Sequence, residues 1–139
     1  VQTSLNLGIL KTENGCVNFD YSVRSSVGSE KDMIIDKVCL LLSSQGAEVT
    51  VSGEYPAWEY RKDSALREKM IRVYEKMFKT APRVEAIHAG LECGILASKL
   101  PGLDCVSIGP DMKDIHTPRE RLSISSTERV WNYILEILK

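Results

Sequence analysis

Residues 86–110 read AIHAGLECGILASKLPGLDCVSIGP, and this stretch decides the fold class. Its first residues complete an apolar run at 83–87 that predicts a strand, and residues 105–108 predict a second strand. Residues 91–100, between the two, predict a helix. Helices that alternate with short apolar strands are typical of an α/β layer, in which ligands bind beyond the carboxyl ends of strands. We therefore expect an α/β fold, in which His88 follows the first of these strands.

The chain before this stretch predicts a small layer of strand, strand, helix and strand. Apolar residues alternate at 3–10 and at 17–23, and Asn14-Gly15 between them is a strong hairpin turn, because both residues tolerate positive φ. Ser29 is expected to cap a helix that ends at Gly46. Residues 47–52 are expected to form a third strand.

A turn-rich, aromatic passage at 53–58 is a plausible domain boundary. Beyond it, Ser64 is expected to begin a helix, and Ser126 or Thr127 is expected to cap the last helix. Glu128 would then lie in the first turn of that helix, where a carboxylate favours the helix dipole. The expected apolar stripe of the last helix consists of Val130, Trp131, Ile134, Leu135 and Leu138.

Composition excludes several classes of protein. The 139 residues suffice for one ordinary domain, and the formal charge of −1 argues against a nucleic-acid surface. No apolar run reaches the roughly eighteen residues of a membrane helix. The four cysteines lack zinc-knuckle spacing, and with no secretion signal we expect reduced thiols in a cytoplasm. The first residue, Val1, suggests a chain cut from something longer, and a processed or engineered start is the alternative.

The segment GPDMKDIHTPRER, residues 109–121, reads as a loop and contains one of only two histidines. His116 has three readings: a metal ligand, a general acid or base, or a solvated surface imidazole. Asp114 and Glu120 are candidates to orient its ring as hydrogen-bond acceptors. A zinc site needs three or four protein ligands, and the spacing of His88 and the carboxylates singles out no such set.

Two further features have a functional and a structural reading. Gly90 and Gly94 bracket a helix start, where glycine lets an anion approach the backbone N–H groups. A tight strand-to-helix turn, with Glu92 offsetting the dipole, is the simpler explanation. Arg24 ends a strand, so it is either a surface ion-pair partner or a fork that holds a carboxylate with two hydrogen bonds.

Taken together, five stretches resemble one family: SLNLGILKTENG, YSVRSS, GAEV, AIHAGLECGILASKLPGLDCVSIGP and IHTPRERLSISS. They resemble the C-terminal part of bacterial aminoacyl-histidine dipeptidases, which are carnosinase-like Xaa-His dipeptidases of the peptidase D type. This family belongs to the clan of two-zinc aminopeptidases and carboxypeptidases. The resemblance covers essentially the whole chain, and residues 88–125 are its most specific part.

The resemblance assigns roles to three residues. It implies that His116 is a metal ligand, that Arg24 holds the terminal carboxylate of a dipeptide, and that the backbone of Gly90 faces the bound substrate. The family's other ligands (a histidine, two aspartates and a glutamate) and its general-base glutamate come from an N-terminal half that this sequence lacks. No catalytic residue is therefore expected within this chain. Two positions differ from the family pattern. Thr117 stands where relatives often carry serine, and Asp114-Ile115 stands where they often carry Gly-Ala.

The implied function is hydrolysis of Xaa-His dipeptides by a water that two divalent metal ions, expected to be zinc, activate. The chain alone would then be inactive. Residues 1–55 would end a lid domain, and 56–139 would form the C-terminal part of the catalytic domain. The expected partners are the dipeptide substrate and the missing N-terminal half, whereas a homodimer stays open. No nucleic acid and no membrane are expected, and the expected location is the cytoplasm.

Two other readings stay open. The chain is alternatively a stand-alone α/β binding or structural module without catalysis, a reading favoured by the missing ligands. It is also compatible with a relative of the same fold that acts on another substrate, such as tripeptides or acylated amino acids.

Overall fold

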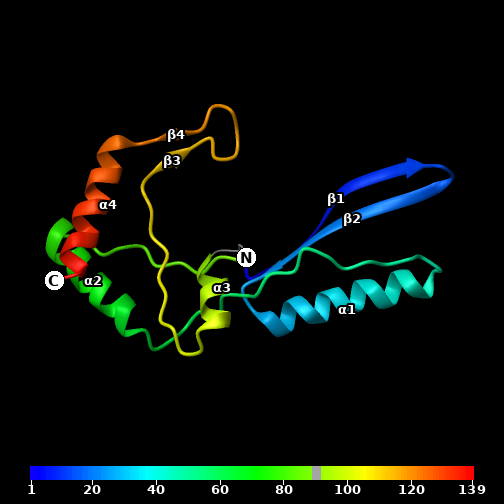
Figure 1. Cartoon of the computed structure of the whole chain (residues 1–139), viewed down its shortest axis with the longest axis horizontal. Helices are drawn as coiled ribbons and strands as arrows, with labels where there is room; N and C mark the ends of the chain where they lie inside the picture. Colours follow the sequence, from blue (N-terminus) through cyan, green and yellow to red (C-terminus); the bar gives the residue numbers. More distant parts are fainter. Residues whose placement is uncertain (89–91) are drawn as a thin grey trace. The chain divides into compact units, whose positions relative to one another are not determined.

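The structure, a computed structural model, describes residues 1–88 and 92–139 (Figure 1). The chain forms two compact units, each made of two separate segments. Unit 1 comprises Val1–Arg61 and Glu85–Leu103, and unit 2 comprises Lys62–Val84 and Asp104–Lys139. The expected division at residue 55 concerns the domains of a longer protein, and it stays a prediction.

A long antiparallel hairpin begins unit 1 and confirms the first two predicted strands. Strand β1 (Thr3–Glu13) pairs with β2 (Cys16–Ser25), from Thr3 opposite Ser25 to Glu13 opposite Cys16. The turn is the predicted Asn-Gly pair, with φ of 52° at Asn14 and 76° at Gly15. The turn consists of two consecutive residues between the paired strand ends, so the local sequence was sufficient to predict it.

Helix α1 (Gly28–Ser44) follows the hairpin, and its start corrects the prediction that Ser29 caps it. Val27 occupies the cap position and contributes no side-chain hydrogen bond. Instead, the Ser25 hydroxyl accepts from the Val27 N–H (3.0 Å), and the Glu59 carboxylate accepts from the Gly28 N–H (3.0 Å). Acceptors outside the helix therefore satisfy N–H groups at its start. The helix stops before Gly46, as expected, where φ is 81°.

Helix α3 (Glu92–Lys99) confirms a helix after His88, and it brings a glycine close to a backbone. A Cβ atom on Gly94 would lie 2.9 Å from the Pro56 carbonyl oxygen and 3.5 Å from the Trp58 Cβ. Gly94 therefore permits close packing inside the helix, a role that differs from the expected strand-to-helix turn. Gly90 lies outside the described residues.

Unit 2 contains helix α2 (Ala65–Phe78), and Ser64 caps it as predicted. The Ser64 Oγ accepts from the Arg67 N–H (3.0 Å) and donates to the Asp104 carboxylate (2.7 Å). The same carboxylate accepts from the Leu66 N–H (3.0 Å), so an acidic group joins the Ser64 hydroxyl in stabilising the positive end of the helix.

Helix α4 (Ile124–Ile137) packs against α2 (Figure 1), and its cap is Ser123 rather than the predicted Ser126 or Thr127. The Ser123 Oγ accepts from the Ser126 N–H (3.3 Å). The predicted apolar stripe was also wrong in part, because Trp131, Leu135 and Leu138 are exposed. The buried aromatic residue of this helix is Tyr133, which the stripe omitted.

The three expected strands at 47–52, 83–87 and 105–108 are not strands in the structure. The two sheets of the described residues are the pairs β1–β2 and β3–β4, so neither sheet includes these segments. A strand exists only where a neighbour accepts and donates its backbone hydrogen bonds. Val51, Val84 and Ile108, one in each segment, accordingly stay 43–46% exposed.

None of the helices in residues 1–88 and 92–139 is both long and apolar enough to cross a membrane.

Candidate functional site

The segment 109–121, expected to be a loop, is organised as a short antiparallel hairpin in unit 2 (Figure 1). Strand β3 (Met112–Lys113) pairs with β4 (Arg121–Leu122). The Asp111 carbonyl oxygen accepts from the Ser123 N–H (3.0 Å), which closes the hairpin at its base. His116 lies in the connection between the two strands and is exposed.

The backbone of this connection is tightly folded. His116 and Asp114 both have left-handed φ values, 64° and 53°, which residues with a Cβ rarely adopt. The Asp114 carbonyl oxygen accepts from the Thr117 N–H (3.2 Å) and from the Thr117 hydroxyl (2.7 Å). The connection is therefore a defined turn that gives His116 one backbone conformation.

Asp114 and Glu120, the expected acceptors for the His116 ring, have other partners in the structure. The Glu120 carboxylate accepts from the His116 backbone N–H (3.0 Å). The Asp114 carboxylate pairs with the Arg121 guanidinium at 2.7 Å. The expectation that they orient the His116 ring was therefore wrong. Glu120 binds the main chain of the turn, and Asp114 binds a guanidinium.

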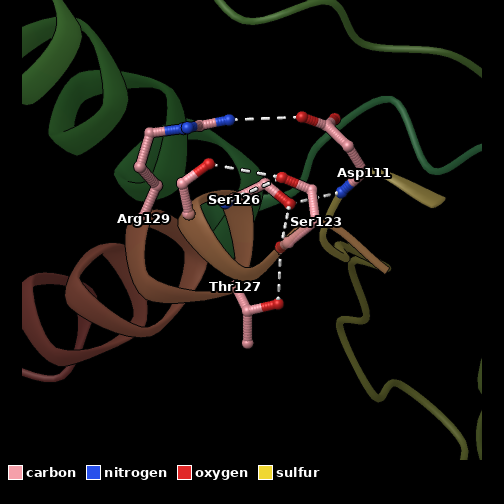
Figure 2. A network of polar contacts seen from close by, with 6 residues as sticks. Asp111, Ser123, Ser126, Thr127 and Arg129 are labelled. Atoms are coloured by element: carbon pink, nitrogen blue, oxygen red, sulfur yellow. Dashed lines mark hydrogen bonds and ion pairs between the residues drawn. The ribbon is translucent and has the colours of Figure 1, made fainter. Parts of the chain in front are cut away.

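A polar network attaches the base of the hairpin to the first turn of α4 (Figure 2). The Ser126 Oγ accepts from the Asp111 N–H (2.8 Å) and donates to the Ser123 carbonyl oxygen (2.9 Å). Ser126 is only 3% exposed, so its hydroxyl lies in a partly buried position where both bonds are worth more than at the open surface. At the surface, the Arg129 guanidinium pairs with the Asp111 carboxylate at 3.2 Å. The hairpin is consequently held by a helix that itself packs against α2.

An open pocket of about 210 Å³ lies beside this network. Aromatic rings of Tyr74, Phe78 and Tyr133 line part of it, and Asp111 and Arg129 contribute charges that pair with each other. Because these charges are mutually compensated, the pocket offers no clear preference for an anion or a cation.

Arg24 lies on β2 opposite Ser4, in unit 1, and its side chain is exposed. Among the described residues its guanidinium has no ion-pair partner. In the part of the chain that it describes, the structure therefore does not show the ion pair that the structural reading of Arg24 expected.

The described residues do not form a complete metal site by themselves. Residues 1–88 and 92–139 contain no group of three or more His, Cys, Asp or Glu side chains arranged to hold a metal ion. An exposed imidazole at His116 is suited to supply one nitrogen ligand, and structural zinc needs about four ligands. The metal role of His116 stays a prediction.

Known proteins match this chain along its whole length, although no family model matches it. The cytosol non-specific dipeptidase of Escherichia coli (strain K12) is 34% identical over all 139 residues, which are 29% of its own length. The crystal structure of aminoacylhistidine dipeptidase from Vibrio alginolyticus superposes with a TM-score of 0.84 and 33% identity. That match covers 99% of this chain and 28% of the other.

A third match shows the fold alone. The crystal structure of aminopeptidase PepT from Bacillus cereus ATCC 10987 has a TM-score of 0.75 at 19% identity, covering 98% of this chain and 39% of the other. The chain is thus homologous to dipeptidases and spans less than a third of their length. The resemblance read from the sequence is confirmed, as is the α/β class of a peptidase fold.

Proposed function

We propose that this chain is part of a metal-dependent dipeptidase that hydrolyses dipeptides with a free carboxylate, including those that end in histidine. The observation that carries the proposal is the similarity of all 139 residues to a dipeptidase of which they cover 29%. The names of the two dipeptidase relatives imply different substrate ranges, because one is called non-specific and the other is called an aminoacylhistidine dipeptidase. The preference for histidine is therefore the finer part of the proposal.

In this proposal His116 supplies a neutral imidazole nitrogen from the connection between β3 and β4. The two divalent ions, zinc as the expected metal, would polarise the scissile carbonyl and acidify a water. The remaining ligands and the general base are proposed to come from a part of the protein outside this chain. The described residues by themselves contain no group of three or more side chains that could hold a metal ion, which is compatible with this division. No catalytic residue is proposed within the chain itself.

Arg24 would bind the carboxylate of the dipeptide. A guanidinium presents parallel N–H groups that match two carboxylate oxygens, which fixes the orientation of the substrate. Its exposure and the absence of a described ion-pair partner support this role. The backbone of Gly90 is proposed to face the substrate as well. A cytoplasmic location is part of the proposal, supported by four free cysteines and by the cytosolic name of the E. coli relative.

The test compares the 139-residue chain with the complete product of the gene that encodes it. Both are assayed on β-alanyl-histidine and on dipeptides without histidine, with added zinc or manganese. We expect hydrolysis by the complete protein and none by the chain above a metal-only blank. Turnover by the chain alone would contradict the division of ligands, and an inactive, metal-loaded complete protein would contradict the function.

The competing proposal is a stand-alone α/β module that binds without catalysis. The lack of a metal-ligating cluster among the described residues favours it. A reading frame that begins near Val1 would support this module, whereas a long N-terminal extension would support the dipeptidase.

A further inference from the structure

We propose that Glu120 is a positioning residue for His116. Its carboxylate holds the His116 backbone in the conformation that points the imidazole toward the proposed metal ion. The inference rests on the proposed role of His116 as a metal ligand. It adds to that role a residue that touches neither the metal nor the substrate.

The contact itself is specific. The Glu120 Oε2 accepts from the His116 N–H at 3.0 Å, four residues back along the chain. The acceptor of this hydrogen bond is a charged carboxylate, and such hydrogen bonds are roughly twice as strong as those between neutral groups. The bond therefore acts on the residue whose φ of 64° is sterically disfavoured.

Glu120 is itself fixed at its backbone. Its N–H donates to the Thr117 carbonyl oxygen at 3.1 Å, and the Arg119 N–H donates to the Thr117 hydroxyl at 3.2 Å. The Glu120 side chain thus starts from a defined point and reaches back across the turn. The two ends of the turn are held together by the β3–β4 pairing.

The consequence for the imidazole follows from geometry. The φ angle of His116 sets the direction of its Cα–Cβ bond, so a return to an ordinary φ would turn the ring elsewhere. Ligand groups work only when held within about 0.5 Å of the productive position. An exposed turn without this hydrogen bond would sample several ring positions, which weakens a metal site.

Three variants separate the effects of the acceptor and of the charge. Glu120→Ala removes the acceptor, Glu120→Gln keeps an oxygen acceptor without the charge, and Glu128→Ala removes an equal charge from the exposed surface of α4. The first readout is amide hydrogen exchange at His116, followed by NMR in the metal-free complete protein labelled with ¹⁵N-histidine. We expect exchange to speed up about tenfold in Glu120→Ala, with most protection kept in Glu120→Gln and all of it in Glu128→Ala.

The second readout is the affinity for zinc, measured by titration against a competing chelator. Outer partners of metal ligands typically change affinity by about 10- to 100-fold, so Glu120→Ala is expected to fall in that range while Glu120→Gln recovers most of it. Unchanged exchange and affinity in Glu120→Ala would overturn the positioning role alone. Full zinc binding by His116→Ala would instead overturn the proposed ligand, and the inference with it.

Discussion

The Tyr133 hydroxyl donates a 2.7 Å hydrogen bond to the Met70 carbonyl oxygen, and both residues are 7% exposed. The bond joins α4 to α2 in the middle of the small core of unit 2. The rings of Tyr74 and Phe78 meet Tyr133 edge-on, with centroids 5.6 and 6.3 Å away. Ser126 of α4 accepts a hydrogen bond from Asp111 at the base of the hairpin that carries His116. The packing of α4 on α2 therefore helps to hold this hairpin in place.

Tyr133→Phe is expected to destabilise unit 2 by about 1 kcal/mol, the usual net value of a buried hydrogen bond. The ring and its aromatic contacts remain, so the loss isolates the hydroxyl. Denaturant unfolding at neutral pH measures it. The control is Tyr21→Phe, a half-buried tyrosine of β2, which should leave stability within about 0.5 kcal/mol.

The same variant tests a pH dependence. Burial, and secondarily the nearby Tyr74, raise the pKa of Tyr133 above its ordinary value. A group with a raised folded-state pKa contributes its stability below the unfolded pKa, near 10, and loses it as pH rises through the folded pKa. The wild type should therefore lose stability at alkaline pH more steeply than Tyr133→Phe. Parallel curves above pH 10 would contradict this assignment.

Ser126→Ala is expected to cost about 1–3 kcal/mol, because it leaves the Asp111 N–H without its buried acceptor. Ser125→Ala is the matched control, since Ser125 is the exposed neighbour on the same turn. Thermal unfolding compares the two. A Ser126→Ala protein as stable as its control would show that the hairpin base needs no such anchor.

Gly94→Ala is expected to destabilise unit 1 by about 1–3 kcal/mol, because the new methyl group would meet the Pro56 carbonyl oxygen at 2.9 Å. Gly109→Ala serves as the control, since a Cβ there has no atom within 4 Å. Equal melting temperatures for the two variants would mean that the backbone at Pro56 yields without cost.

Arg24→Lys keeps the charge and loses the two-pronged hydrogen bond. In the complete protein we expect a lower kcat/KM, by about tenfold or more, on dipeptides with a free carboxylate and little change on amidated ones. The assay is a pair of matched substrates. An unchanged preference between them would remove Arg24 from the proposed substrate site.

His116→Ala is expected to leave the melting temperature of this chain nearly unchanged, because the side chain is exposed and lies outside the core. In the complete protein, bound zinc and turnover should both fall sharply, since one ion loses a ligand. Metal analysis and a hydrolysis assay measure the two. A variant with its full complement of zinc and near-normal turnover would identify His116 as an ordinary surface histidine.

Features set by neighbouring residues were the ones that sequence could predict. The Asn14-Gly15 turn and the Ser64 cap depend on a few adjacent residues, and both were confirmed. The α4 cap was misplaced because four hydroxyl residues lie close together there: Ser123, Ser125, Ser126 and Thr127. Ser123 caps the helix, whereas the Ser126 hydroxyl accepts from the N–H of Asp111, a residue distant in the sequence. Strands such as 105–108 were overpredicted, since apolar pattern cannot reveal whether a partner strand is present.

The site was foreseen in part for the same reason. His116 stood out by its residue type, but its left-handed backbone and the hydrogen bond from its N–H to the Glu120 carboxylate did not, because residue type alone does not reveal how a turn folds. Tyr133 was missed because its neighbours Trp131 and Leu135 are also apolar, so the sequence does not show which face of α4 is buried. The packing of α4 on α2 determines that face.

The β1–β2 ribbon has a consequence for how this chain behaves in solution. Among the described residues no third strand pairs with it, so each strand keeps one outer row of backbone donors and acceptors. Leu5, Leu7 and Phe19 are 43–49% exposed on the same ribbon. Open edges with apolar side chains are templates for adding further strands. Self-association of concentrated samples would therefore start at this ribbon, and light scattering would follow its growth.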